Sequence, residues 1–598
     1  MYILGIYYGH NATAVLLRNG EVIASASEER FNGKKNFVGF PKKAIDFVLS
    51  SAKIHPSELE LVTIPLKYSS PAHTFSATKK NIYVQLLIVF YIPAFLIRKL
   101  WGILTFYVPV LDPIGRICNR SIGYLIGSVI NKKERNTIAA YLGIQKEKVK
   151  SYDHHLSHAA SGYYSSPFNR KKALVITLDG EGDFSSGSIN IFEKDFWKVI
   201  FKLPRESSLG NLYTYLTIYL GMMSGEHEYK VMGLAPYAKK EDVEKLYKKI
   251  KNIVRINPQT LQIYTTFNTM NTEQFLKAKM QKVRFDLLAG VFQKLMEEKI
   301  TEWVKYAIKK TGIHTVVLGG GVFMNVKVNQ KIAELSEVNK LFVIPSCGDE
   351  SSILGSSYLA YIESCKDKNK KINIPPISNI YWGQKYTNGD IEKIIKQKKL
   401  GNKYSIIKLG NIEKKVAEIL AKGNIVARMT GRMEFGARAL GNRSILADPR
   451  NSRIVKIINE QVKNRDFWMP FAPSILYEKR HEYIKNPKNH IAYYMMMTFN
   501  TTPKGREELV AAMHPYDLTV RPQLVKKAHN PQYYKLIKEF EKITGVGAVL
   551  NTSFNLHGMP IVLGPKEAFY AFEKSGIMYM ALENYLIEKR SRLQKRNF

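Results

Sequence analysis

"YILGIYYGHNATAVLLRNGEVIASAS" (residues 2–27) opens the chain with a pattern that predicts three strands. The apolar run "YILGI" leads into the turn "YYGHN", and "ATAVLL" follows it. Asn19-Gly20 is a dipeptide typical of the type I′ turn between antiparallel strands, and "EVIASAS" returns after it. The chain is therefore expected to begin with strand, turn, strand, turn, strand.

A second stretch repeats this pattern far along the chain. "ALVITLDGEGDFSSGSINIF" (residues 173–192) predicts a strand, a turn at Asp179-Gly180 and a second strand. Two hairpins with polar glycine turns indicate a duplicated architecture, and each turn could present backbone N–H groups to a phosphate. Two unrelated hairpins are the alternative.

Length and composition limit the class of protein. A chain of 598 residues is too long for one ordinary core, so two or three domains are expected. Its three cysteines show no CxxC spacing, which argues against a disulfide framework or a cysteine-ligated zinc and favours a reducing cytosol. The N-terminus resembles a strand rather than a signal peptide.

The domain boundary is predicted in "KDKNKKINIPPISN" (residues 366–379), a polar stretch with two adjacent prolines. The first domain would cover residues 1–370 and the second residues 380–598. Within the first, helical and strand patterns alternate, as in α/β domains. "HTVVLGGGVFMNVKVNQKI" (residues 314–332) predicts strand, glycines and helix, a join that can bind anions.

The net charge of +38 indicates an anionic partner, although a basic composition of the whole proteome would also produce it. An apolar, basic insertion is expected at about 66–135. Within it, two apolar runs between 83 and 111 are too short to span a bilayer as helices, and residues 79–135 carry nine basic and two acidic side chains. This composition favours contact with an anionic membrane surface or a lipid-linked substrate. A buried insertion or an oligomer interface is the alternative.

A candidate metal site lies in "YDHHLSHAASGYY" (residues 152–164). His154 and His158 are four residues apart and would share one face of a helix. Asp179 and Asp349 follow predicted strands, where α/β sheets gather ligands. Two imidazoles and two carboxylates suit zinc or iron. A histidine pair that is simply hydrogen-bonded is the alternative, and His155 is expected to pack or to support the ligands.

The second domain carries a candidate anion site. "GRMEFGARALGNRSILADPR" (residues 431–450) places four arginines among Gly, Ala and Leu. Further cations and small polar groups follow in "VKNRD", "TVRPQ" and "LNTSFN". Such groups suit a triphosphate or an acyl phosphate, and a basic surface patch is the alternative.

Nine motifs together resemble the O-carbamoyltransferase family, which includes nodulation and antibiotic carbamoyltransferases. They extend in order along the chain: "GIYYGHNATA", "EERFNGKKNFVGFP", "DHHLSHAASGYY", "EYKVMGLAPYA", "LGGGVFMN", "GDESSILG", "GRMEFGARALGNRSILADPR", "PFAPSIL" and "LNTSFN". The resemblance implies an α/β chain with an actin/Hsp70-like (duplicated ribonuclease-H-like) N-terminal domain of the threonylcarbamoyl-transfer branch. A YrdC/Sua5-like α/β domain would follow it.

The resemblance also implies the chemistry. The second domain would form carbamoyl adenylate from carbamoyl phosphate and ATP. The first domain would then pass the carbamoyl group to a hydroxyl of a sugar, glycan or natural product, and a lipid-linked acceptor is one of the expectations. Fe²⁺ or another divalent transition metal would serve the first domain, and Mg²⁺ would assist with ATP. A cytoplasmic protein is expected, with peripheral contact to the inner face of the membrane and a homodimer as further expectations. The alternative is a tRNA threonylcarbamoyladenosine-type enzyme, with tRNA as partner.

Carried onto this sequence, the family's functional residues fall into three sets. The metal ligands would be His154, His158, Asp179 and Asp349. The catalytic set would be His10 as general base, Lys35, Arg438, Lys463 and Arg465. The nucleotide and carbamoyl phosphate ligands would be Gly319, Gly320, Asn325, Arg432, Arg443, Arg521, Asn551 and Ser553. The chain departs from the family pattern at Asn11, where an Asp is usual, and at Met469, where an Arg is frequent.

Overall fold

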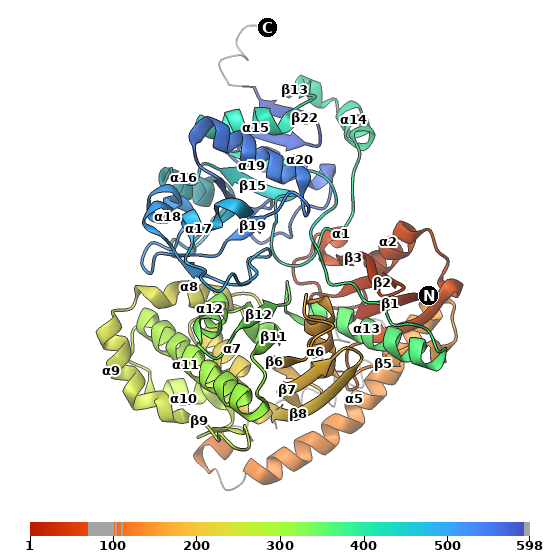
Figure 1. Cartoon of the computed structure of the whole chain (residues 1–598), viewed down its shortest axis with the longest axis vertical. Helices are drawn as coiled ribbons and strands as arrows, with labels where there is room; N and C mark the ends of the chain where they lie inside the picture. The colour runs from red at the N-terminus through yellow and green to blue at the C-terminus, as the bar shows by residue number, and fades with distance from the viewer. Residues whose placement is uncertain (70–100, 102–103, 109–111, 591–598) are drawn as a thin grey trace. The chain divides into compact units, whose positions relative to one another are not determined.

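The computed structural model describes residues 1–69, 101, 104–108 and 112–590, the side chains of residues 112–119 excepted (Figure 1). It divides into two compact units. The first comprises Met1–Glu28 and Asn36–Ile377, and the second comprises Glu29–Lys35 and Ser378–Phe598. The chain thus passes from the first unit to the second between Ile377 and Ser378, inside the predicted stretch with two prolines. The short N-terminal segment Glu29–Lys35 also belongs to the second unit.

The first sheet contains the three strands expected at the N-terminus. Its members are β1 (Tyr2–Tyr7), β2 (Thr13–Arg18), β3 (Glu21–Ser27), β4 (Leu59–Ile64) and β5 (Val149–Ser151). The order is β3-β2-β1-β4-β5, with β1, β2 and β3 antiparallel and β1, β4 and β5 parallel. Asn19 and Gly20 have φ of 52° and 83°, which confirms the type I′ turn.

The second sheet repeats the first in order and direction. Its members are β6 (Ala173–Gly182), β7 (Ser185–Glu193), β8 (Phe196–Pro204), β11 (Thr315–Gly319) and β12 (Lys340–Val343). The order is β8-β7-β6-β11-β12, again with three antiparallel strands followed by two parallel partners. This repetition confirms the duplicated ribonuclease-H-like architecture expected for the first domain.

The turn of the second hairpin differs from the prediction. Strand β6 continues through Asp179-Gly180, and the chain reverses at Asp183 and Phe184, with φ of 47° and 61°. The predicted turn at Asp179-Gly180 is therefore wrong. An aspartate is common in the left-handed region of such turns, but a phenylalanine is not, and contacts with Tyr68 and Tyr124 hold Phe184 there.

Helices surround these sheets in the first unit (Figure 1). They are α2 (Lys42–Ala52), α5 (Asp112–Leu142), α6 (His154–Ser165), α7 (Leu209–Tyr219), α8 (Glu228–Leu234), α9 (Lys240–Ile250), α10 (Thr272–Lys279), α11 (Phe285–Thr311), α12 (Val326–Glu334) and α13 (Asp349–Asp367). A small sheet adds β9 (Val254–Ile256) and β10 (Ile263–Thr265).

Glycines let helices α6 and α13 approach closely. At Gly355 of α13 a Cβ would lie 1.7 Å from the carbonyl oxygen of Ser157 on α6. At Gly5 of β1 a Cβ would lie 2.4 Å from Oγ of Ser357. Any side chain at these positions would push the elements apart. The two glycines therefore bring the starts of α6 and α13 close to the sheets.

The second unit is built on one mixed sheet of eight strands in the order β13-β22-β21-β14-β15-β20-β16-β19. They are β13 (Tyr404–Lys408), β14 (Val426–Met429), β15 (Arg443–Ala447), β16 (Ala472–Leu476), β19 (Gln523–Val525), β20 (Ala548–Ser553), β21 (Tyr579–Leu582) and β22 (Tyr585–Lys589). A separate pair is β17 (Phe499–Asn500) and β18 (Thr519–Val520).

The helices of the second unit are α1 (Glu29–Asn32), α14 (Asn388–Gln397), α15 (Ile412–Ala421), α16 (Arg453–Ile458), α17 (Arg480–Tyr483), α18 (Pro503–Glu508), α19 (Pro531–Thr544) and α20 (Pro565–Lys574). Apolar residues from the strands and from α14, α16 and α20 form its main core, including Ile445, Leu550 and Phe572. The α/β class expected for the second domain is confirmed.

The predicted insertion is only partly visible. Most of the apolar stretch 83–111 lies outside the described residues, and α5 begins directly after it. Ile122, Leu125 and Val129, which recur at helical spacing on α5, are 58%, 70% and 61% exposed. None of the helices in the described part of the chain combines the length and the apolarity that a membrane crossing needs.

Candidate active site

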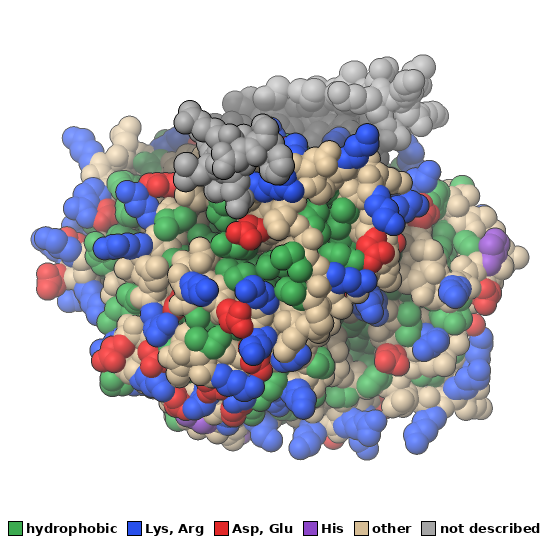
Figure 2. Space-filling model, turned by 90° about the horizontal axis from the view of Figure 1, so that it is seen from above, with side chains coloured by type: hydrophobic (Ala, Val, Ile, Leu, Met, Phe, Trp, Pro, Cys, Tyr) green, Lys and Arg blue, Asp and Glu red, His purple; other side chains and the backbone are tan. Residues whose placement is uncertain are grey.

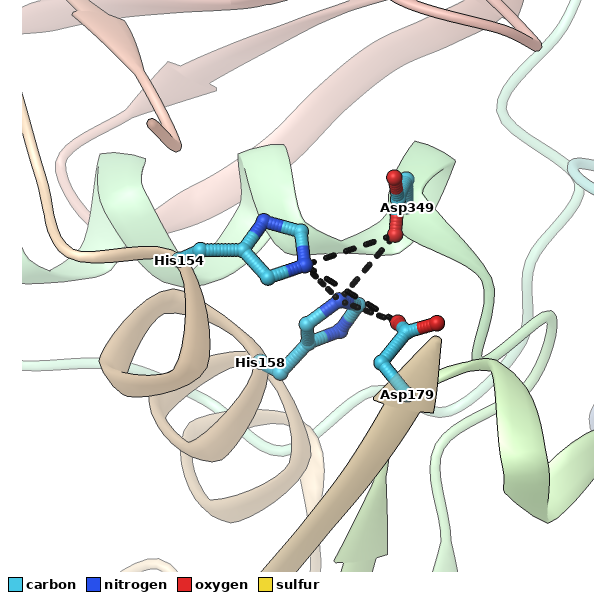
Figure 3. A group of neighbouring side chains, drawn as sticks. All are labelled: His154, His158, Asp179 and Asp349. Atoms are coloured by element: carbon cyan, nitrogen blue, oxygen red, sulfur yellow. Dashed lines mark hydrogen bonds and ion pairs between the residues drawn. The ribbon is translucent and has the colours of Figure 1, made fainter. Parts of the chain in front are cut away.

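Four side chains from three elements converge in the first unit (Figure 3). His154 and His158 lie one turn apart on α6, Asp179 lies in β6, and Asp349 is the first residue of α13. The carboxylate of Asp153 caps α6 by accepting a hydrogen bond from the backbone N–H of Leu156. The structure thus brings together the whole ligand set that the sequence predicts.

The ligand atoms of this cluster lie at the spacing of a coordination shell. His158 Nε2 is 3.1 Å from His154 Nε2, 3.2 Å from Asp179 Oδ2 and 3.3 Å from Asp349 Oδ1. His154 Nε2 is 3.6 Å from Asp349 Oδ1 and 3.8 Å from Asp179 Oδ2. Ligands that each lie about 2.0–2.2 Å from one ion are separated by about 3–3.5 Å from one another.

The chemistry of the donor set fits a divalent transition metal. Two imidazole nitrogens that face each other at 3.1 Å need a cation or a proton between them. Mixed imidazole and carboxylate ligands suit iron and zinc alike. His154 Nδ1 lies 3.3 Å from the carbonyl oxygen of Pro65, an outer contact that orients Nε2 toward the cluster.

Electrostatics favours a bound cation here. Burial alone would lower the pKa of His154, but the charges of Asp349 and Asp179 raise it to about 10. Burial and Asp179 would raise the pKa of Asp349, but His154 and His158 lower it to about 2. Both carboxyl groups are therefore ionised at neutral pH, and the buried site attracts positive charge.

His155 does not belong to the ligand set. Its Nδ1 lies 3.1 Å from Thr177 Oγ1, and its side chain is buried. Burial and the neighbouring charges of His154 and His158 lower the pKa of His155 to about 3. It is a neutral packing residue beside the ligands.

His10 and a residue that the sequence analysis missed lie beside Asp349. His10 Nε2 is 3.8 Å from Asp349 Oδ2, and its side chain is 48% exposed. The buried Tyr7 hydroxyl donates a hydrogen bond to Asp349 Oδ2 and lies 3.5 Å from His10 Nδ1. Tyr7 ends β1 directly before the glycine turn, which is the signal that could have identified it.

The glycine run after β11 supports the cluster through its backbone. Gly320 has φ of 96°, and a Cβ at Gly319 would lie 2.8 Å from the carbonyl oxygen of His158. The N–H of Gly321 donates to Asp179 Oδ2 at 3.1 Å. Asn325 caps α12 through Val328 N–H and exchanges hydrogen bonds with Gln293. Its amide thus has a structural role in this structure.

Lys463 marks a second site, in the second unit. It ends a π-helical turn, Asn459–Lys463, and Asn464 follows in the left-handed region at φ 41°. Such turns are rare in proteins, and those that occur often lie at functional sites. The buried Lys463 Nζ donates to the Ser553 backbone oxygen and Oγ, and to the carbonyl oxygen and Oδ1 of Asn555.

Five cations influence one another around Lys463. Burial, with the charges of Arg465 and Lys35, holds the pKa of Lys463 well below its ordinary value. Burial, with Arg438 and Arg465, likewise lowers the pKa of Arg521. The buried Nε of Arg521 has no hydrogen-bond partner in the described part of the chain. We call Lys35, Arg438, Lys463, Arg465 and Arg521 the cationic cluster, and an anion would relieve its mutual repulsion.

Lys35 therefore lies with the second unit, although the boundary predicted from the sequence places it in the first domain. Its segment Glu29–Lys35 packs with the second unit. Arg30 donates to the carbonyl oxygen of Gly436 at 2.9 Å, and Phe31 packs against the apolar cluster around Met433.

Three other predicted ligands have structural partners. The fully buried Arg443 donates to backbone carbonyl oxygens of Gln384, Thr430, Gly431, Asn442 and Leu563. Arg432 donates to the carbonyl oxygens of Trp382 and Gly383. Asn551 Nδ2 donates to the carbonyl oxygen of Ala439 and to Ser474 Oγ. These side chains hold loops together in this structure.

We predict that Tyr7→Phe weakens metal binding without unfolding the protein. The change deletes the hydrogen bond that orients Asp349, and loss of such outer contacts typically weakens metal affinity about tenfold to a hundredfold. Titration of the metal-free protein with Co²⁺ measures this. Tyr264→Phe, at an exposed tyrosine, is the control. Unchanged Co²⁺ affinity in Tyr7→Phe would contradict the role of Tyr7.

Comparison with known proteins gives a consistent result. Residues 2–358 match the family profile "Carbamoyltransferase N-terminus", and residues 417–589 match "Carbamoyltransferase C-terminus". One uncharacterized protein of Methanocaldococcus jannaschii is 36% identical over 466 residues, which cover 75% of each chain. Another from the same organism is 31% identical over 601 residues, covering 98% of this chain and 99% of the other.

Nodulation protein NolNO of Sinorhizobium fredii is 29% identical over 596 residues, covering 97% of this chain and 79% of that protein. The similarity extends across both units and includes the four metal-cluster residues and the cationic cluster within the matched ranges. On these matches, the chain belongs to the carbamoyltransferase family of enzymes.

Proposed function

We propose that the chain is an ATP-dependent O-carbamoyltransferase that performs two reactions, one in each unit. The second unit would form carbamoyl adenylate, and the first would transfer the carbamoyl group to an acceptor hydroxyl. The observation that carries the proposal is the cationic cluster, in which burial and the charges of neighbouring cations lower the pKa values of Lys463 and Arg521. A site of this kind suits polyanionic substrates.

Adenylation would consume ATP, carbamoyl phosphate and water and yield carbamoyl adenylate, pyrophosphate and phosphate. Arg438, Arg465 and Arg521 would hold phosphate oxygens and stabilise the negative charge that develops on the leaving pyrophosphate. Lys463, whose ammonium group is oriented by hydrogen bonds to Ser553 and Asn555, would also stabilise this charge. Mg²⁺ would accompany ATP. We leave Arg432, Arg443 and Asn551 out of this ligand set because backbone carbonyls and buried polar groups engage them.

Transfer would occur at the metal cluster of the first unit. His154, His158, Asp179 and Asp349 would hold Fe²⁺ or another divalent transition metal, which when bound acts as a Lewis acid on phosphate or carbamoyl oxygens. His10 is half-exposed beside Asp349 and would accept the proton of the acceptor hydroxyl. The hydroxyl oxygen would then bond to the carbamoyl carbon, and AMP would leave.

The acceptor would be a hydroxyl of a sugar, glycan or natural product, presented on a lipid or at a membrane surface. The exposed apolar side chains of Ile122, Leu125 and Val129 on α5 support this, with Lys132 and Lys133 exposed directly after them. Apolar groups bordered by lysines suit the interface of an anionic bilayer.

The two-reaction scheme predicts separable losses. Lys463→Met should lower pyrophosphate release from ATP and carbamoyl phosphate at least about a hundredfold, since it removes a cation that stabilises the developing charge. His154→Ala should leave pyrophosphate release intact and abolish transfer. Pyrophosphate-release and carbamoyl-transfer assays on the full chain measure the two steps. Equal loss of both activities in both variants would contradict the scheme.

Proton uptake should accompany ATP binding. In the free protein the pKa of Lys463 is lowered, and a bound polyanion would raise it because opposite charge favours the protonated amine. Between the two pKa values Lys463 gains a proton on binding, so affinity should fall as pH rises through that window. Calorimetry in buffers of different ionisation enthalpy measures the uptake. Lys403→Met, at an exposed lysine, should retain it, and uptake that persists in Lys463→Met would refute the assignment.

Contact of α5 with an anionic membrane predicts vesicle binding that falls with salt. The double change Leu125→Ser and Val129→Ser should weaken sedimentation with phosphatidylserine vesicles several-fold, because it removes apolar area from the interface. Phe196→Ser, at an exposed apolar residue outside α5, is the matched control. Binding that is equal for all three proteins would remove α5 from the membrane proposal.

A further inference from the structure

The hairpin turn Gly182–Phe184 places an aromatic residue in a conformation that local sequence preferences do not explain. It joins β6, which carries Asp179, to β7. Asp183 and Phe184 both lie in the left-handed region, at φ 47° and 61°. A bulky aromatic residue there is unusual, and such a conformation persists only where surrounding contacts impose it.

The Asp183 carboxylate binds the beginning of the metal-binding helix. Its Oδ2 accepts from the backbone N–H of His154 at 2.8 Å, the first residue of α6. Its Oδ1 accepts from the N–H of Tyr68 at 2.8 Å and of Lys67 at 3.0 Å. The first N–H groups of a helix have no partner within the helix, and a carboxylate there is also favoured by the helix dipole. Asp183 therefore fixes the backbone from which the His154 ring projects.

Gly182 provides the space that this ring occupies. A Cβ at Gly182 would lie 2.0 Å from Cδ2 of His154 and 2.6 Å from its Nε2, the atom that faces the other ligands. Any other residue at position 182 would displace the imidazole. Two consecutive residues of the turn thus fix the position of His154. Asp183 holds the backbone of His154, and Gly182 leaves the space for its ring.

Phe184 connects the same turn to the insertion helix α5. Its ring centroid lies 4.2 Å from that of Tyr124 on α5 and 5.5 Å from that of Tyr68. At Gly123 of α5 a Cβ would lie 2.6 Å from the Phe184 ring. The guanidinium of Arg205 lies 5.3 Å from the ring centroid of Phe184. Helix α5 therefore holds the left-handed Phe184 in place.

We propose that Gly182–Phe184 is a positioning element of the metal centre and that α5 is part of that centre's support. Asp183 and Gly182 place His154, and Gly123 with Tyr124 places Phe184. Helix α5 is thereby a structural requirement of metal binding, in addition to any contact that its exposed face makes. This inference rests on the metal cluster of the proposed function and extends it to residues outside the ligand set.

The test uses metal-free full-length protein titrated with Co²⁺, whose visible spectrum reports the ligand geometry. Asp183→Asn keeps a residue that tolerates the left-handed region but leaves one accepting oxygen in place of two. Gly123→Ala adds one methyl group against Phe184, and alanine favours a helix over glycine, so weaker binding would not come from lost helicity. Each variant should raise the Kd for Co²⁺ about tenfold and change the spectrum.

Two matched controls separate positioning from general damage. Asp195→Asn changes an exposed aspartate in the next hairpin turn, after Lys194 at φ 54°. Ser121→Ala changes an exposed residue of α5. Both controls should bind Co²⁺ like the wild-type protein. Pyrophosphate release should be unchanged in all four variants, and each variant should keep a cooperative melting transition.

The outcomes are decisive in each case. Wild-type Kd and spectrum in Asp183→Asn and Gly123→Ala would overturn the positioning role while leaving the metal centre intact. Failure of the wild-type protein to bind Co²⁺ would overturn the metal centre and this inference with it. If Asp183→Asn does not fold, Gly123→Ala decides alone, since it leaves every hydrogen bond of the turn in place.

Discussion

The close packing of α6 on α13 is the constraint on which the first unit depends. Ser157 lies between the two metal-binding histidines, and its carbonyl oxygen occupies the space that a Cβ at Gly355 would fill. Because α13 begins with Asp349, this contact sets the distance between the ligands of the two helices. Strand β6 of the second sheet then adds Asp179. The packing of the two helices therefore brings together ligands that are almost two hundred residues apart in the chain.

Burial of like charges distinguishes the two units. In the first, two ionised aspartates are buried with two histidines, and their charges raise the pKa of His154. In the second, burial and the charges of neighbouring cations together lower the pKa values of Lys463 and Arg521. Charge buried in this way is costly unless an opposite charge binds. The chain thus has one site that attracts a cation and another that attracts an anion.

The arginines of residues 431–450 show the limit of motif reading. Arg438 and Arg443 occur in the same motif with similar neighbours, and both were predicted to lie in the substrate site. In the structure Arg443 is buried among carbonyl oxygens, whereas Arg438 belongs to the cationic cluster. The number of backbone carbonyls within reach of a guanidinium depends on loop packing, and residue type and spacing do not encode it.

The sequence by itself determined the three N-terminal strands, the α/β class and the candidate set of four metal-cluster residues, because period-two patterns, the Asn-Gly turn and helical spacing are local properties. Tertiary structure alone decided that Tyr7 reaches Asp349, that Lys35 joins the second unit and that the hairpin turns at Asp183 rather than at Asp179. These outcomes depend on contacts between residues far apart in the chain, whose packing energy outweighs the local preferences that a sequence displays.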